Sequence, residues 1–171
     1  MAVVVLDIAK PTVMNPDIYS FLLHLHSIGR WILLLLLLVA IFNSLVAGQR
    51  PWIRTDARTG SILTITADIM LLVGLAIWYW GPRGYKLIDA LGMNAVMKDS
   101  YNRFFAIEHI TGMLIAIILI HIGKAQARKK ISDRAKHRRT VIFYLIALII
   151  ILAMIPWPFR HIGEQAGSHW Y

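Results

Sequence analysis

The sequence contains no cysteine. This absence excludes disulfide bonds, zinc sites built from thiolates, iron–sulfur clusters and haem attached through thioether bonds. Charge is also scarce, because Asp, Glu, Lys and Arg make up 16% of the 171 residues, whereas an ordinary soluble domain has roughly 25%. Long stretches carry almost no charge, and the basic residues cluster between them. This distribution is typical of a membrane protein, and the length suits one domain.

The sequence contains four long apolar runs. They cover about residues 19–46, 61–80, 103–123 and 139–156. Since a helix of roughly 20 apolar residues crosses a hydrocarbon core ~30 Å thick, each run predicts a transmembrane helix. The expected fold class is all-α integral membrane, a four-helix bundle over residues 19–160 with up-down-up-down topology. Residues 1–18 are expected to form an exposed segment, either a docking strand for a partner or a mobile tail, and residues 161–171 a C-terminal tail.

Lys and Arg decide the expected orientation, because short cytoplasmic loops are enriched in these residues. The loops after the first and third runs together hold eleven of them, against six on the other side. We therefore predict that both termini and the loop 81–102 face outward. The expected location is the bacterial inner membrane, with several crossings and periplasmic termini. The net charge of +9 is then assigned to anchoring in the bilayer and not to nucleic acid.

The outward loop 81–102 is long for a connection between two helices and contains several glycines. Within it, the stretch 85–96 predicts a short amphipathic helix lying on the membrane surface. Such a helix would form a partial lid over the outer end of the bundle.

Ionisable residues inside transmembrane helices are costly and usually mark a functional site or a specific pairing. Here they are His24, His26, Arg30, Asp68, Glu108, His109 and His121. From the rise of a helix, His26 lies roughly 10 Å and His109 roughly 9 Å below the outer boundary. Two histidines at one depth in a four-helix bundle are the usual axial ligands of a haem b, so these two are our candidate metal ligands.

His24 competes with His26 for this role, because residues two apart point to different sides of a helix. We prefer His26, since Arg30 follows four residues later on the same face, where a guanidinium facing the core is more favourable than one facing lipid. His24 is then expected at an interface with a neighbouring subunit. Arg30 and Asp68 also have similar depths. We therefore expect either that they pair across the helix interface, or that Arg30 binds a haem propionate while Asp68 stays neutral.

The remaining ionisable residues have less specific expectations. Glu108 is expected to orient a ligand, carry a proton, or pair with Arg103 at the rim. His121 lies twelve residues beyond His109, but a second haem would need an inner histidine on another helix, and there is none. His121 is therefore placed at the cytoplasmic headgroup level, and His137 is expected in a solvent-facing basic loop.

The sequence resembles a group of small four-helix bacterial membrane proteins known as "cytochrome B". The resemblance covers about residues 19–160 and is carried by several motifs. These are Leu23-His24-Leu25-His26-Ser27 with Arg30-Trp31, Met97-Lys98-Asp99 with Arg103-Phe104-Phe105, Glu108-His109-Ile110, Ala135-Lys136-His137 with Ile142-Phe143-Tyr144, and Ile155-Pro156-Trp157-Pro158-Phe159-Arg160. Relatives often carry a histidine in the second span where this chain has Asp68, so the resemblance supports no third ligand.

The resemblance implies a b-type haem and electron transfer. Electrons would pass between a quinol in the bilayer and an outer acceptor, or into a larger respiratory complex with other membrane subunits. A quinone is therefore a candidate partner, and the chain is expected to be an electron-transfer or accessory subunit with no catalytic residues of its own. A haem-free structural subunit of a membrane assembly is the alternative. A proton path through Asp68, Glu108 and Arg30 is disfavoured, because no inverted repeat or broken helix is present.

Overall fold

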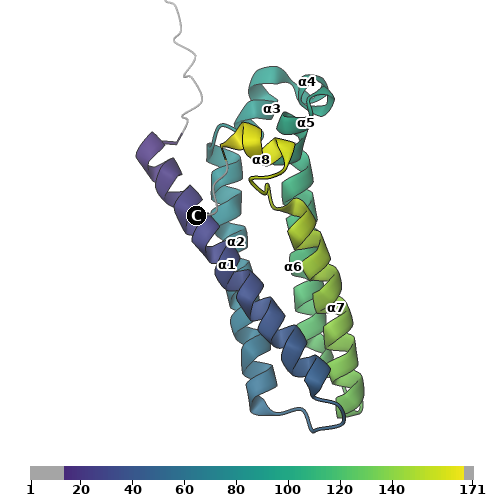
Figure 1. The fold of residues 1–171 in the computed structure, drawn as a ribbon. Coiled ribbons are helices and arrows are strands. Elements are labelled where there is room, and N and C mark those ends of the chain that lie inside the picture. The colour runs from purple at the N-terminus through teal and green to yellow at the C-terminus, as the bar shows by residue number, and fades with distance from the viewer. Residues whose placement is uncertain (1–13, 168–171) are drawn as a thin grey trace, which may run out of the picture.

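Four long helices form the body of the protein (Figure 1). The structure, a computed structural model, describes residues 14–167, so most of the predicted exposed N-terminal segment and the last four residues of the predicted tail lie outside the described residues. The long helices are α1 (Pro16–Val46), α2 (Arg54–Trp80), α6 (His109–Gln126) and α7 (Asp133–Met154). Each is long and apolar enough to cross a membrane, which confirms the predicted all-α four-helix bundle.

Two of the long helices, α1 and α7, begin at side chains that cap them. Asn15 accepts hydrogen bonds from the first backbone amides of α1, with Pro16 in the first turn. Ser132 caps α7 by accepting from the amide of Ala135. The α7 helix therefore begins six residues before the predicted apolar span and includes several of its basic residues.

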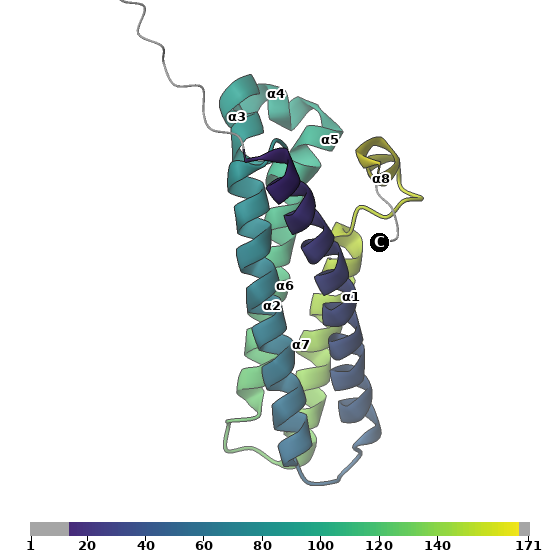
Figure 2. The ribbon, with the colours of Figure 1, turned by 90° about the vertical axis from the view of Figure 1, so that its left-hand side faces the viewer.

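The helices pack in the cyclic order α1, α2, α6, α7, so each of them contacts two others (Figures 1 and 2). At one end, which we call the short-loop end, only the turns 47–53 and 127–132 connect the helices. At the other, the capped end, lie the short helices α3 (Tyr85–Leu91), α4 (Met93–Lys98), α5 (Ser100–Arg103) and α8 (His161–Ala166). The helix predicted over 85–96 is therefore broken. The break falls at Gly92, whose φ of +79° is readily adopted only by glycine.

The interior of the bundle consists of aliphatic and small side chains. Ala67, Ala116 and Ala147 are fully buried and let the helix backbones approach closely. The outer surface is equally apolar, with side chains such as Leu35, Leu72 and Ile149 about two-thirds exposed, at 64%, 67% and 65%. A surface of this kind is stable against lipid and unstable against water. It indicates a multi-pass protein with a bilayer around it.

The expectation that His137 faces solvent is wrong. The side chain is only 2% exposed, and its ring lies 4.8 Å from the ring of Trp52, centroid to centroid. The reason is the early start of α7, which places His137 on a helix face that packs against the bundle.

Candidate functional site

A single widened turn precedes His109 at the start of α6. Residues Phe104–Glu108 form a π-helical turn, η1, in which the amide of His109 donates to the carbonyl of Phe104. Within this turn the carbonyl of Ala106 accepts a hydrogen bond from Nε1 of Trp78, at 2.8 Å. Such turns often occur at functional sites, because one extra residue re-aims the side chains that follow. Here the side chain that follows is His109.

His26 of α1 and His109 of α6 face each other inside the bundle. Their ring centroids lie 6.3 Å apart, and the ring planes make an angle of 65°. The two helices are diagonal in the bundle, so this contact spans its interior. The depth estimate thus identified two imidazoles that the structure brings together, near the capped end.

The His109 ring is fixed by a backbone carbonyl. Its Nδ1 lies 2.8 Å from the carbonyl oxygen of Met154, the last residue of α7. Because a carbonyl can only accept, Nδ1 carries the proton and Nε2 keeps its lone pair. This is the arrangement that holds a metal-binding histidine in one tautomer and orientation.

His26 has no such partner. Its Nδ1 is buried and makes no hydrogen bond within the described residues. Gly74 of α2 lies against the same ring, so that a Cβ at this position would stand 3.2 Å from Cε1 of His26. The small residue therefore leaves the imidazole room that a larger side chain would take.

A cavity of about 380 Å³ surrounds the two histidines. Its walls are mainly apolar and include Leu33, Met113 and Ile151. A volume above 300 Å³ with apolar walls and a few convergent polar groups is typical of a ligand site. Within the described part of the chain no cluster of three or more His, Asp or Glu side chains is suited to a metal ion. The protein donors that face each other in this cavity are the imidazoles of His26 and His109.

Arg30 also lines this cavity, one helical turn beyond His26 on α1. One of its terminal nitrogens donates to Ser27 Oγ at 3.2 Å, its guanidinium lies 5.1 Å from the Trp31 ring centroid, and its buried Nε has no hydrogen-bond partner among the described residues. The guanidinium thus retains a free donor and a positive charge beside the imidazoles.

The predicted pairing of Arg30 with Asp68 is wrong. Asp68 accepts instead from Nε2 of His121 on α6, at 2.8 Å. Both side chains are 49% exposed on the outer surface between α2 and α6. The polar pair therefore lies on the lipid-facing side of the bundle and outside the cavity.

The remaining predicted residues lie near the rim of the site. Nε of Arg103 donates to a carboxylate oxygen of Glu108 at 2.6 Å, which is the rim pairing named among the expectations for Glu108. His24 is exposed, and its Nδ1 lies 2.7 Å from the Ser20 carbonyl. It also borders the mouth of the cavity.

Sequence reasoning missed Gly74, the Met154 carbonyl and the π-helical turn. None of them has a side chain with chemistry of its own, so no residue pattern could mark them. Comparisons with known proteins add no further candidates: no family model, no curated protein and no solved structure matches the chain.

Proposed function

We propose that the protein is a membrane-embedded electron-transfer protein that binds one haem b, with His26 and His109 as its axial ligands. The observation that carries this proposal is the pair of imidazoles 6.3 Å apart across one apolar cavity. His26 and His109 would hold the haem iron through their ring nitrogens, and the iron would supply the electron-transfer chemistry.

The surrounding residues support the same cofactor. His109 presents Nε2 because its Nδ1 is bound to Met154, and Gly74 leaves space beside His26. Arg30 supplies a positive charge and an unpartnered donor, which suit an acidic group at the edge of a ligand. When bound, haem would supply one-electron chemistry at a potential tuned by its ligands and by burial. The chain's own residues hold the ring, exclude water from it and fix the orientation of His109.

The orientation of the protein forms part of this proposal. The short-loop end carries most of the Lys and Arg residues, which favours a cytoplasmic location for that end in a bacterial inner membrane. The cavity lies near the capped end, with Arg83 and Gly167 on its walls. The haem would then lie in the outer half of the bilayer, near an acceptor on that side or within a larger redox complex. A quinol in the bilayer is the proposed donor.

A reduced-minus-oxidised spectrum tests the haem. Chain purified in mild detergent should show the α-band of a six-coordinate haem b after dithionite reduction. His26→Ala and His109→Ala should each abolish this band, because one imidazole cannot hold a bis-histidine site.

The matched controls are the histidines outside the pair. His24→Ala and His121→Ala should keep the band, since neither histidine belongs to the pair of facing rings. The absence of any band in folded protein would refute the haem proposal. A band that survives His109→Ala would refute the ligand assignment.

A haem-free subunit of a larger membrane assembly is the second candidate, and one observation favours it. The Asp68–His121 pair is half-exposed on spanning helices, where lipid is a poor environment for ionisable groups. A partner helix packed over α2 and α6 would remove this cost. The test is a tagged chain isolated from its native membrane. A stoichiometric partner, no haem band, and loss of that partner in Asp68→Leu would favour this candidate, whereas a chain isolated alone would exclude it.

A further inference from the structure

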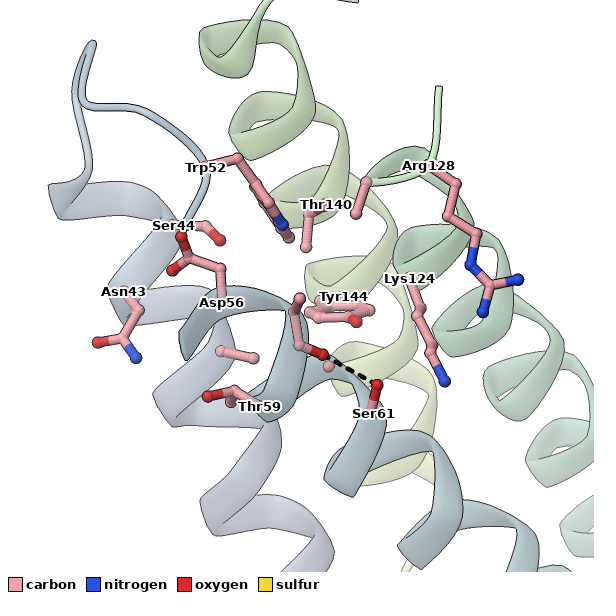
Figure 3. Close-up of a pocket in the computed structure, with 14 residues that line it drawn as sticks. Asn43, Ser44, Trp52, Asp56, Thr59, Ser61, Lys124, Arg128, Thr140 and Tyr144 are labelled. Carbon is pink, nitrogen blue, oxygen red and sulfur yellow. Dashed lines mark hydrogen bonds between the residues drawn. The ribbon is translucent and has the colours of Figure 1, made fainter. Parts of the chain in front are cut away.

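A second cavity, of about 300 Å³, lies at the short-loop end and differs in chemistry from the first (Figure 3). Its walls combine apolar surface with many polar side chains. They include Asn43, Ser44, Asp56, Thr59, Ser61, Lys124, Arg128, Thr140 and Tyr144. None of these residues takes part in the proposed haem site.

The acidic side of this cavity is already neutralised. Both carboxylate oxygens of Asp56 accept from the guanidinium of Arg50 at 2.7 Å, and one also accepts from the amide of Ile53. The hydrogen bonds to Asp56 raise the pKa of Arg50, so the two side chains stay charged and paired with each other. In Figure 3, Asp56 lies on the side of the cavity opposite Lys124 and Arg128.

The basic side has no counter-charge. Lys124, on the last turns of α6, and Arg128, just after the helix, extend along the same wall (Figure 3). Neither forms an ion pair with any residue from 14 to 167. Two adjacent unpaired cations beside a cavity favour an anion there.

Tyr144 supplies an independent sign of a ligand. Its side chain is only 1% exposed and lines the cavity, yet no hydrogen bond of its hydroxyl is found in the described part of the chain. Figure 3 shows the hydroxyl directed toward the side where Lys124 stands. Gly60 keeps the space above it open, because a Cβ there would lie 3.3 Å from the hydroxyl oxygen. The hydroxyl therefore borders the cavity, where a ligand or water can accept a hydrogen bond from it.

We propose that this cavity binds the phosphate headgroup of an anionic phospholipid, held by Lys124 and Arg128 and accepting a hydrogen bond from the hydroxyl of Tyr144. The cavity lies where the spanning helices end, which is the level of lipid headgroups. Basic pockets between transmembrane helices at this level bind such headgroups. The proposal depends only on the membrane location of the chain and not on haem.

Native mass spectrometry of the full chain in neutral detergent tests the site, with phosphatidylglycerol and phosphatidylcholine as probes. The first phosphatidylglycerol should bind about thirtyfold more tightly than phosphatidylcholine, because two basic residues together contribute about 2 kcal/mol to anionic-lipid binding. The double variant Lys124→Gln/Arg128→Gln should lose this preference.

The matched control is Lys129→Gln/Lys130→Gln, which removes the same charge from the same turn but outside the cavity. It should keep the preference. An equal loss in the control would overturn the proposal, because binding would then follow the overall charge of the loop. Equal affinity for the two lipids would overturn it as well.

Two single variants keep the test decisive if the double variant does not fold. Tyr144→Phe removes only the hydroxyl and should weaken phosphatidylglycerol binding about tenfold, the contribution of one hydrogen bond to a charged group. Gly60→Ala narrows the cavity beside that hydroxyl and should weaken binding as well. Unchanged affinity in both variants would place the lipid elsewhere. Displacement of phosphatidylglycerol by inorganic phosphate at equal concentration would show that the site takes free phosphate, which also overturns the lipid assignment.

Discussion

The two ends of the bundle enclose cavities of similar size whose walls carry different polar groups. Near the capped end the walls are mainly apolar, and the polar groups among them include the two facing imidazoles and the Arg30 guanidinium. At the short-loop end hydroxyls, an amide and charged groups contribute to the walls, with Asp56 already bound to Arg50. The two proposals therefore place a large apolar ring at one end of the chain and an anionic headgroup at the other.

The difference shows how polar atoms are satisfied in an apolar bundle. The Asp56–Arg50 pair satisfies its own charges and needs no ligand, so the loss of one partner would be destabilising. The buried nitrogens of His26 and Arg30 lack partners within residues 14–167 and therefore depend on what fills the cavity. Buried polar atoms that lack a hydrogen-bond partner beside a cavity indicate a binding site. Polar groups that pair with each other indicate a structural role. Variants that act on one end alone test this division.

The largest effect is expected from a change that closes the cavity near the capped end. Gly74→Val places branched carbon atoms where even a Cβ would lie 3.2 Å from the His26 ring. We expect complete loss of the haem α-band with the helical content retained. Absorbance and circular dichroism of the same preparation measure both. Phosphatidylglycerol binding should be unchanged, because the second cavity lies at the other end, and a loss of both activities would show that the variant disturbs the whole bundle.

The next effect is expected at the short-loop end. Asp56→Asn removes the charge that both terminal nitrogens of Arg50 contact, from a side chain that is only 3% exposed. Because the asparagine retains the shape but not the charge, we expect a fall of several degrees in the thermal midpoint in detergent.

Asp68→Asn is the matched control for Asp56→Asn, since its carboxylate is 49% exposed and has a single histidine partner. A much smaller fall is expected there. Equal falls in the two variants would contradict the division between a structural pair and a lipid-facing pair. Neither variant should alter the α-band.

The sequence predicted the four helices because the bilayer itself imposes the pattern, requiring long apolar runs with basic residues between them. Depth along the helix axis also followed from residue counting, and this identified His26 and His109. Residue counting does not give the rotation of a helix about its own axis, so it does not show which side chains face each other. For this reason the prediction that Arg30 pairs with Asp68 is wrong. In antiparallel α2 and α6 each Cβ tilts toward its own N-terminus, so the side chains of Asp68 and His121 approach each other from different levels.

Other features had no signal in the sequence. The π-helical turn is a change of backbone hydrogen bonding that ordinary apolar residues can adopt. Gly74 is one of several glycines in the chain, and only its distance to His26 gives it a role. His137 was misplaced because the capping of α7 by Ser132 extended the helix beyond its apolar part.

The smallest effect is expected at the rim of the capped end. Arg103 and Glu108 flank the π-helical turn, and their ion pair at 2.6 Å has side chains 34% and 40% exposed. Exposed pairs contribute at most about 1 kcal/mol, so Arg103→Gln should shift the thermal midpoint less than Asp56→Asn and leave the α-band in place. The hydrogen bond from Trp78 to the Ala106 carbonyl holds the same turn from inside the bundle, and the Met154 carbonyl holds the His109 ring from α7. Loss of the α-band in Arg103→Gln would contradict this, because the turn would then depend on its exposed ion pair for the position of His109.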